Sequence, residues 1–274
     1  MFRWCIVTNH KILCNYGTGD TVNQILWMES VSANNYDIIA STRNVGIVQC
    51  VFEFLQSNKP KMFSGNLTSF DVPLHGFPSG LPVIRLTPQQ QITDIPKDSV
   101  IHVHTQPRYW HSFISCRVNL DTVFPVPNQT LKTKTCILFA ERSDNFSVDK
   151  ELWLQIIIKL LNKGYEVFSN ISGKNHVYQH EKLLPNTKPL LLNHIELCNK
   201  IKFSDPNNII CIGQRSGIFD LLKWSPIKKI VLYPDNPVNF YDDCNFLNDP
   251  TAKNIYDIKI TDIIDTVKQV EALL

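Results

Sequence analysis

The sequence is short of glycine and lacks several features that mark common classes of protein. Ten glycines in 274 residues is about half of the average usage, roughly 7 %, so we expect them where backbone geometry demands them. The charges nearly cancel, with 27 Lys and Arg against 25 Asp and Glu, which argues against nucleic-acid binding through a concentrated positive field. The chain is nevertheless 43 % hydrophobic, which is enough to build folded cores.

The cysteines form no recognisable pair or cluster. None of the eight belongs to a Cys-x-x-Cys motif, and several lie inside apolar runs, as Cys136 and Cys211 do. This predicts buried thiols in a reducing cytosol rather than disulfides or a zinc site. The N-terminal apolar stretch is too short for a signal peptide, and no apolar run is long enough to span a membrane. We therefore expect a cytoplasmic protein whose contact with a membrane would be peripheral.

The length predicts two domains, at a prior of roughly 150 residues each. Residues 123–134 contain two prolines followed by polar residues and separate two apolar regions, as a linker does. We expect a first domain over residues 1–125 and a second over residues 126–274.

Apolar strands alternate with amphipathic helices, most clearly in the second half. There the pattern predicts strands over 135–140, 166–169, 209–212 and 229–233, and helices over 148–162, 218–222 and 262–274. In the first half it predicts helices over 21–32 and 45–55, strands over 36–41, 82–86 and 99–105, and loops over 64–81 and 87–98. Continuous apolar strands between helices indicate an α/β fold with a doubly wound parallel sheet.

Four of the ten glycines form two close pairs, each expected between a strand and a helix. They are Gly17 with Gly19, and Gly213 with Gly217. Such turns lie at the carboxyl ends of parallel strands, where backbone N–H groups can bind phosphate. In the second pair Ser216 can donate a hydrogen bond, and Arg215 can pair with a phosphate or orient the loop; a plain glycine-capped turn is the alternative. Neither pair completes a Walker or a dinucleotide-binding fingerprint.

Charged and histidine residues near the predicted strand ends give further candidates. Asp20 is either a helix N-cap or a carboxylate that accepts a proton from an attacking hydroxyl. Arg142, in the turn after residues 135–140, either neutralises a leaving diphosphate or is a solvated loop charge. His102 and His104 face the same side of a predicted strand and fit an ordinary strand pair better than a metal site.

Together these motifs resemble the heptosyltransferase-like glycosyltransferases, relatives of the enzymes that transfer heptose from ADP-heptose to lipopolysaccharide. Gly19-Asp20 before an amphipathic helix resembles their first-domain signature. The second half resembles the nucleotide-sugar domain of related GT-B enzymes. The segments that carry this second likeness are residues 141–143, Glu151-x-Trp153, 163–167, Asn170, Gly213-x-Arg215-Ser216-Gly217-x-x-Asp220 and 229–233.

The resemblance implies a GT-B architecture, in which two Rossmann-like doubly wound domains border a cleft. It implies metal-independent transfer with inversion, without a cofactor, from a nucleotide-sugar to a hydroxyl of a bacterial cell-surface or capsular glycan precursor. Asp20 would be the general base. The residues expected to bind the donor are Gly19, Glu141, Arg142, Ser143, Asn170, Gly213, Arg215, Ser216, Gly217 and Asp220.

Two alternatives remain open from the sequence. The same scaffold could serve a nucleotide-sugar epimerase or hydrolase, which would consume the donor with no acceptor present. It could also serve a non-catalytic protein that binds a nucleotide-sugar. Under the glycosyltransferase hypothesis the partners are a nucleotide-sugar donor and a glycan or glycolipid acceptor, and no nucleic acid.

Overall fold

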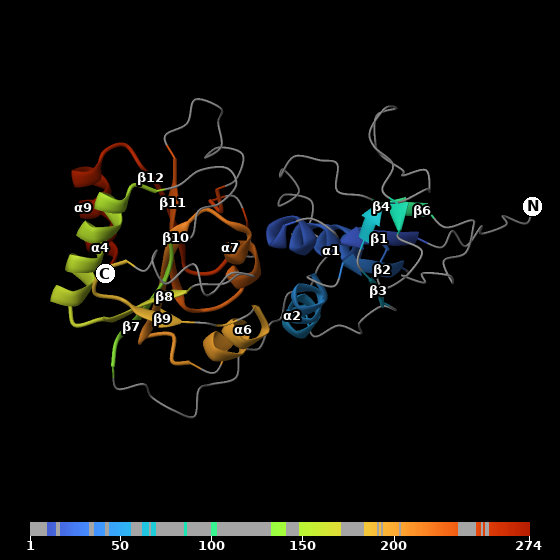
Figure 1. Cartoon of the computed structure of the whole chain (residues 1–274), viewed down its shortest axis with the longest axis horizontal. Coiled ribbons are helices and arrows are strands. Elements are labelled where there is room, and N and C mark those ends of the chain that lie inside the picture. Colours follow the sequence, from blue (N-terminus) through green and yellow to red (C-terminus); the bar gives the residue numbers. More distant parts are fainter. Residues whose placement is uncertain are drawn as a thin grey trace, which may run out of the picture. The chain divides into compact units, whose positions relative to one another are not determined.

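A computed structural model of the whole chain shows two compact units, Met1–Asp121 and Thr122–Leu274 (Figure 1). The structure describes residues 10–14, 17–32, 36–41, 44–55, 62–65, 67–69, 85–86, 100–102, 133–140, 148–170, 184–190, 192, 194–202, 204–234, 245–247, 249 and 252–274.

The second unit is built on a six-stranded parallel sheet. Its strands are β7 (Thr135–Phe139), β8 (Glu166–Asn170), β9 (Lys188–Leu190), β10 (Ile209–Gln214), β11 (Lys228–Tyr233) and β12 (Ile255–Lys259). They lie in the order β12-β11-β10-β7-β8-β9, and every neighbouring pair is parallel. Numbered from β7, this is the 3-2-1-4-5-6 order of doubly wound nucleotide-binding folds. The α/β class predicted from the sequence is confirmed.

Helices cover both faces of this sheet (Figure 1). α4 (Lys150–Asn162) and α9 (Ile263–Leu273) lie on one face, and α6 (His194–Lys202) and α7 (Gly217–Leu222) lie on the other. α4 and α9 bury most of the apolar stripe that the sequence predicts for them, including Trp153, Ile156 and Val270, but Leu161 and Ile264, predicted on the same stripes, are exposed. That layer packs on alternate residues of the central strands, such as Ile212 and Leu232, because successive strand side chains point to opposite faces.

Local chemistry sets the ends of α4. The Asp149 side chain caps its first turn by accepting from the N–H of Glu151 at 2.8 Å. At the other end the N–H of Tyr165 reaches Leu160 O at 3.0 Å and that of Gly164 reaches Leu161 O at 2.9 Å, which is a Schellman motif. Gly164 has φ +80° there, a conformation that favours glycine.

The first unit contains a four-stranded parallel sheet in the order β3-β2-β1-β6. Its strands are β1 (His10–Cys14), β2 (Tyr36–Ser41), β3 (Met62–Gly65) and β6 (Val100–His102), with helices α1 (Thr18–Ser32) and α2 (Val45–Leu55). β4 (Leu67–Ser69) and β5 (Arg85–Leu86) form a separate antiparallel pair. The amide of Asn44, just before α2, donates to the Thr21 hydroxyl of α1 at 3.1 Å.

Several sequence predictions need correction. The stretch 64–81 was predicted as a loop, but β3 ends in it and β4 lies within it. Helix α1 begins at Thr18, before the predicted residue 21, and α4 begins at Lys150 rather than 148. The elements that the sequence did not predict are β1, β3, β4, β9, α6 and β12. Most of the predicted linker 123–134 lies outside the described residues.

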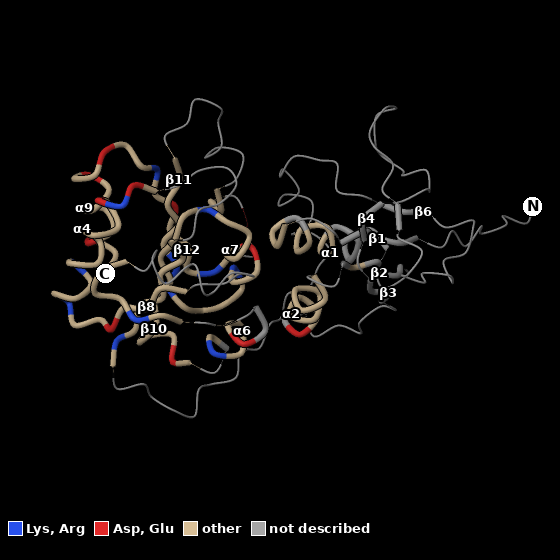
Figure 2. The backbone as a smooth tube through the Cα atoms, viewed as in Figure 1, with Lys and Arg blue, Asp and Glu red and all other residues tan. Residues whose placement is uncertain are grey.

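Charges of both signs occur along the described chain. In the second unit Lys and Arg residues are interspersed with Asp and Glu residues (Figure 2). None of the helices within the described ranges combines the length and apolar character needed to cross a membrane.

Candidate functional site

The strand order of the second unit locates its ligand-binding edge. The chain leaves β7 toward β8 on one side and later enters β10 on the other, so these adjacent strands border a topological switch point. Ligands of open parallel sheets bind outside the carboxyl ends of the strands at such a point. β7 ends at Phe139, which lies opposite Gly213 of β10, and β10 runs on through Gln214 into residues 215–217. This turn, called the β10–α7 turn below, is therefore the candidate site.

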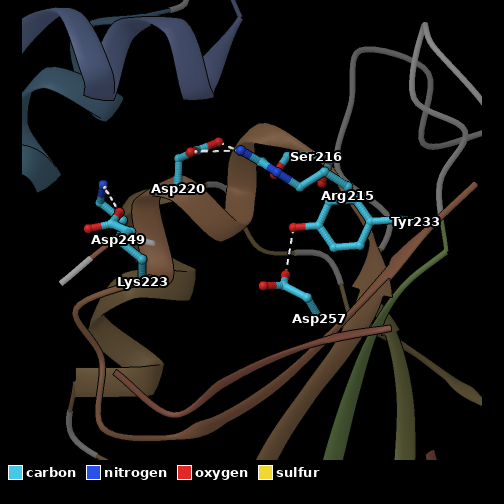
Figure 3. Close-up of polar contacts among 7 residues, drawn as sticks. All are labelled: Arg215, Ser216, Asp220, Lys223, Tyr233, Asp249 and Asp257. Carbon is cyan, nitrogen blue, oxygen red and sulfur yellow. Dashed lines mark hydrogen bonds and ion pairs between the residues drawn. The ribbon is translucent and has the colours of Figure 1, made fainter. Parts of the chain in front are cut away.

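Arg215 of the β10–α7 turn is buried and bonded to protein groups. Its side chain has two charge-assisted bonds to Asp220, Nη1 to Oδ2 at 2.7 Å and Nη2 to Oδ1 at 2.9 Å (Figure 3). Nη1 also donates to Ser216 O at 2.7 Å, and the backbone N–H donates to Leu232 O at 2.8 Å. A bidentate Arg–carboxylate pair fixes geometry strongly. Of the two roles considered for Arg215, this arrangement favours orienting the loop.

The remaining turn residues lie where the chain enters α7. Ser216 is the N-cap residue, with extended backbone and a side chain that makes no capping bond. Gly217 begins the helix, and Asp220 lies within it, 1 % exposed. Ser216 is half-buried, and its hydroxyl takes no part in capping the start of α7.

Gly213 lies inside β10, not in the loop where the sequence placed it. A Cβ atom at this position would lie 2.7 Å from the Cβ of Phe139 and 2.9 Å from ring atoms of Phe219. The two rings pack edge to face, with centroids 5.6 Å apart. Close packing between β10, β7 and α7 therefore requires glycine here, independently of any ligand.

Two buried amides lie at the carboxyl ends of β8 and β10, the two strands that flank β7. Asn170, predicted as a donor-binding residue, ends β8 and is 5 % exposed. Its Oδ1 has no hydrogen-bond partner among the described residues. Gln214, which the sequence analysis missed, is fully buried; its Oε1 accepts from the N–H of Val148 at 3.2 Å, while its Nε2 has no partner in the described part of the chain. A buried amide atom without a hydrogen-bond partner costs free energy of folding. Two such atoms at this edge of the sheet make it a place where a polar ligand could bind.

A second ion pair lies beside the turn and was also missed by the sequence analysis. Lys223, which follows α7, bonds to Asp249 at 2.7 Å, and each side chain is 1 % exposed (Figure 3). The two residues are 26 positions apart, so no short motif indicates that they pair. Arg215 and Lys223 are thus both neutralised by buried carboxylates.

The candidate residues of the first unit lie in the first turn of α1. The N–H of Thr21 donates to Gly17 O at 3.0 Å, so Gly19 and Asp20 belong to the helix. Asp20 is therefore its third residue rather than its N-cap.

Some predicted residues lie outside the described ranges. Glu141, Arg142 and Ser143 do, as does His104, while the backbone of His102 ends β6. Within the described part of the chain, no group of three His, Cys, Asp or Glu side chains could hold a metal ion.

The chain shares its fold with solved glycosyltransferase structures. It aligns with a glycosyl transferase of family 9 from Veillonella parvula over 98 % of both chains, at a TM-score of 0.52 and 9 % identity. It aligns with the E. coli heptosyltransferase WaaC, solved with ADP, over 97 % of this chain and all of that one, at a TM-score of 0.50 and 7 % identity. A third alignment, with the iron-containing heptosyltransferase TibC, covers 58 % of that chain at a TM-score of 0.48.

The first two alignments confirm the predicted resemblance at the level of fold: the chain has a heptosyltransferase-like glycosyltransferase fold. No protein-family model and no curated protein sequence matches the chain. At a sequence identity this low the alignments show the fold alone, so the activity has to be argued from the site.

Proposed function

We propose that the chain is a glycosyltransferase that moves a sugar from a nucleotide-sugar to a hydroxyl of a cell-surface or capsular glycan precursor. The observation that carries this proposal is the position of the β10–α7 turn. It lies at the switch point of a doubly wound sheet in a fold that, over almost its whole length, is shared with a family 9 glycosyl transferase. WaaC, of the same fold, was solved with ADP, which supports a nucleoside diphosphate as the ligand to test first.

In the proposed site the turn receives the donor diphosphate. Ser216 offers a hydroxyl and the turn offers backbone N–H groups, while Arg215 and Asp220 hold the turn in shape. Arg142, in the connection after β7, supplies a cation to the leaving diphosphate. Asn170, at the end of β8, offers an amide with an unused acceptor.

The proposed chemistry is attack by an acceptor hydroxyl on the anomeric carbon. The bond from that carbon to the diphosphate oxygen breaks as the new glycosidic bond forms, with inversion and without a metal. Asp20, in the first turn of α1, takes the hydroxyl proton as general base. On this model the two units act as the two domains of a GT-B enzyme, with the donor bound by the second.

The first test is a thermal-shift panel of nucleoside diphosphates and nucleotide-sugars on the full chain. A ligand that binds only the folded state stabilises it by RT ln(1 + [L]/Kd), about 2.7 kcal/mol at a hundredfold excess over Kd. We expect a nucleoside diphosphate to raise the melting temperature. Arg142→Gln should weaken that response, whereas Lys268→Gln, a matched change at an exposed position of α9, should not. A panel in which nothing raises the melting temperature contradicts the proposal.

The second test separates transfer from binding. Asp20→Asn should bind the donor as the unmodified chain does but lose transfer to any acceptor. Full transfer activity in a folded Asp20→Asn variant would remove Asp20 from the mechanism. Donor consumption that needs no acceptor would instead identify a hydrolase or epimerase.

A further inference from the structure

Asp257 connects three segments that lie far apart in the sequence. It is the third residue of β12 and is half-buried. Its Oδ1 accepts from the hydroxyl of Tyr233, the last residue of β11, at 2.6 Å (Figure 3). Its Oδ2 accepts from the backbone N–H of Phe246 at 2.8 Å. Both carboxylate oxygens are thus used, one on a strand end and one on residues 245–247.

Phe246 carries this connection on to the β10–α7 turn. The guanidinium carbon of Arg215 lies 4.6 Å from the centre of the Phe246 ring, which is 4 % exposed. A cation stacked on a buried ring is held in place by both the charge and the contact area. Arg215 in turn bonds to the carbonyl of Ser216 and to Asp220. A continuous series of contacts therefore runs from Asp257 through Phe246 and Arg215 to the turn.

Charge acts along the same path. Burial raises the pKa of Asp257 above its usual value, while the hydrogen bond from Tyr233 and the charge of Arg215 lower it. The cation of the turn and the carboxylate of β12 therefore interact electrostatically. Asp257 thus stabilises the position of Arg215 in two ways: through its hydrogen bond to Phe246 and through the attraction between the two charges.

We propose that Asp257 is a positioning residue for the β10–α7 turn: by holding Phe246 against Arg215, it fixes the turn in the conformation that accepts the donor diphosphate. This inference rests on the proposed function for the identity of the ligand, but the arrangement of the turn can be tested without it. Asp257 does not touch the donor in this proposal; it acts through Phe246 and Arg215.

The test compares two variants with a matched control. Asp257→Asn keeps the shape of the side chain and removes its charge, and Phe246→Leu keeps an apolar side chain but removes the ring under Arg215. Asp265→Asn, at an exposed position of α9, is the same chemical change away from the turn. Hydrogen exchange of the full chain, measured by mass spectrometry, reads the amides of residues 213–219. Loss of a charge-assisted hydrogen bond of this kind should change the equilibrium constant for local opening of the turn by roughly tenfold.

We expect exchange of residues 213–219 to be about tenfold faster in Asp257→Asn and Phe246→Leu than in Asp265→Asn and the unmodified chain. Strands β7 and β8 should exchange as before in all four proteins. Unchanged exchange at residues 213–219 in both variants overturns the proposal. Should Asp257→Asn not fold, Phe246→Leu decides alone.

A second measurement links the turn to the donor. We expect Asp257→Asn to raise the KM for the donor, and the Kd of a nucleoside diphosphate, about tenfold. The KM for the acceptor should not change, and Asp257→Glu should recover part of the loss. Faster exchange with unchanged donor KM and Kd would refute the positioning role. If the unmodified chain binds no nucleoside diphosphate, the proposed function fails, while the exchange data still decide whether Asp257 holds the turn.

Discussion

Lys229 makes the stability of the second unit depend on pH in a predictable direction. It lies in β11 opposite Cys211 of β10, and its side chain is fully buried. Its Nζ donates to the carbonyl oxygens of Ser225 at 2.5 Å and Ile227 at 2.8 Å. Burial, with a smaller contribution from the charge of Lys253, lowers the pKa of the Lys229 amine from 10.5 to about 7, although Cys211 opposes the shift.

The sign follows from proton binding. Between the folded pKa of about 7 and the unfolded value near 10.4, the unfolded chain binds the proton that the folded chain has released. Stability therefore rises with pH across this window and is lost as pH falls through 7. A full proton corresponds to about 1.4 kcal/mol per pH unit, so between about pH 7.5 and 8.5 we expect a gain of about 1 kcal/mol. For a unit of this size that raises the melting temperature by roughly 2–4 °C.

Calorimetry of the full chain at these two pH values measures the effect. The raised pKa values of Cys136, Cys211 and Tyr233 oppose this rise, but mainly above the usual pKa values of thiol and phenol groups. Their effect is the same in the variants below, so the comparison isolates Lys229. Lys229→Met keeps the length of the side chain but cannot titrate, and we expect the rise to disappear from the transition of the second unit. Lys268→Met, an exposed substitution in α9, should keep it. An equal pH dependence in Lys229→Met and the unmodified chain would falsify the reasoning.

Substitutions at three further sites test the packing around Gly213, one buried ion pair and one helix cap. The measurement in each case is the midpoint of urea unfolding. Gly213→Ala forces a methyl group to within 2.7 Å of the Phe139 Cβ and should destabilise the second unit by about 2 kcal/mol without any ligand; an unchanged midpoint would show that the strands separate at little cost. Asp249→Asn leaves the Lys223 ammonium buried without its counter-charge and should cost about 3 kcal/mol, whereas the double change Lys223→Met with Asp249→Leu should restore most of it. Asp262→Ala removes the carboxylate that caps α9 and should cost about 1 kcal/mol, and no loss would mean that the cap contributes nothing.

The sequence predicted those helices and strands in which the spacing of apolar residues matches the periodicity of the element. β10 and β11 are almost entirely buried and read as continuous apolar runs, and α4 and α9 each carry one apolar stripe. β12 has a single buried residue, Ile258, and β9 has none. These are the two edge strands of the sheet, which pack on one side only and so lack an apolar run. These two strands form because each pairs with a neighbouring strand. A short stretch of sequence around β9 or β12 does not show that pairing.

The same difference separates the predicted site residues from those that were missed. Arg215, Ser216 and Asp220 lie within six consecutive residues, so a short motif was enough to bring them together. Tyr233 and Asp257 are 24 positions apart and meet only because their strands are neighbours in the sheet. Pairings between residues that are distant in the chain depend on strand order, which a single sequence does not display.

The ion pairs change how charge must be distributed in the proposed donor site. A diphosphate brings negative charge, yet both Arg215 and Lys223 are already bonded to buried carboxylates. Taking Arg215 from Asp220 would leave a buried carboxylate unpaired, which costs several kcal/mol, so an exchange of partners on ligand binding is unfavourable. On the proposed function, the N–H groups and hydroxyl of the turn then set the position of the diphosphate. The compensating cation then has to come from another part of the chain, and Arg142, which follows β7 in the sequence, is the residue whose place in the sequence fits that requirement.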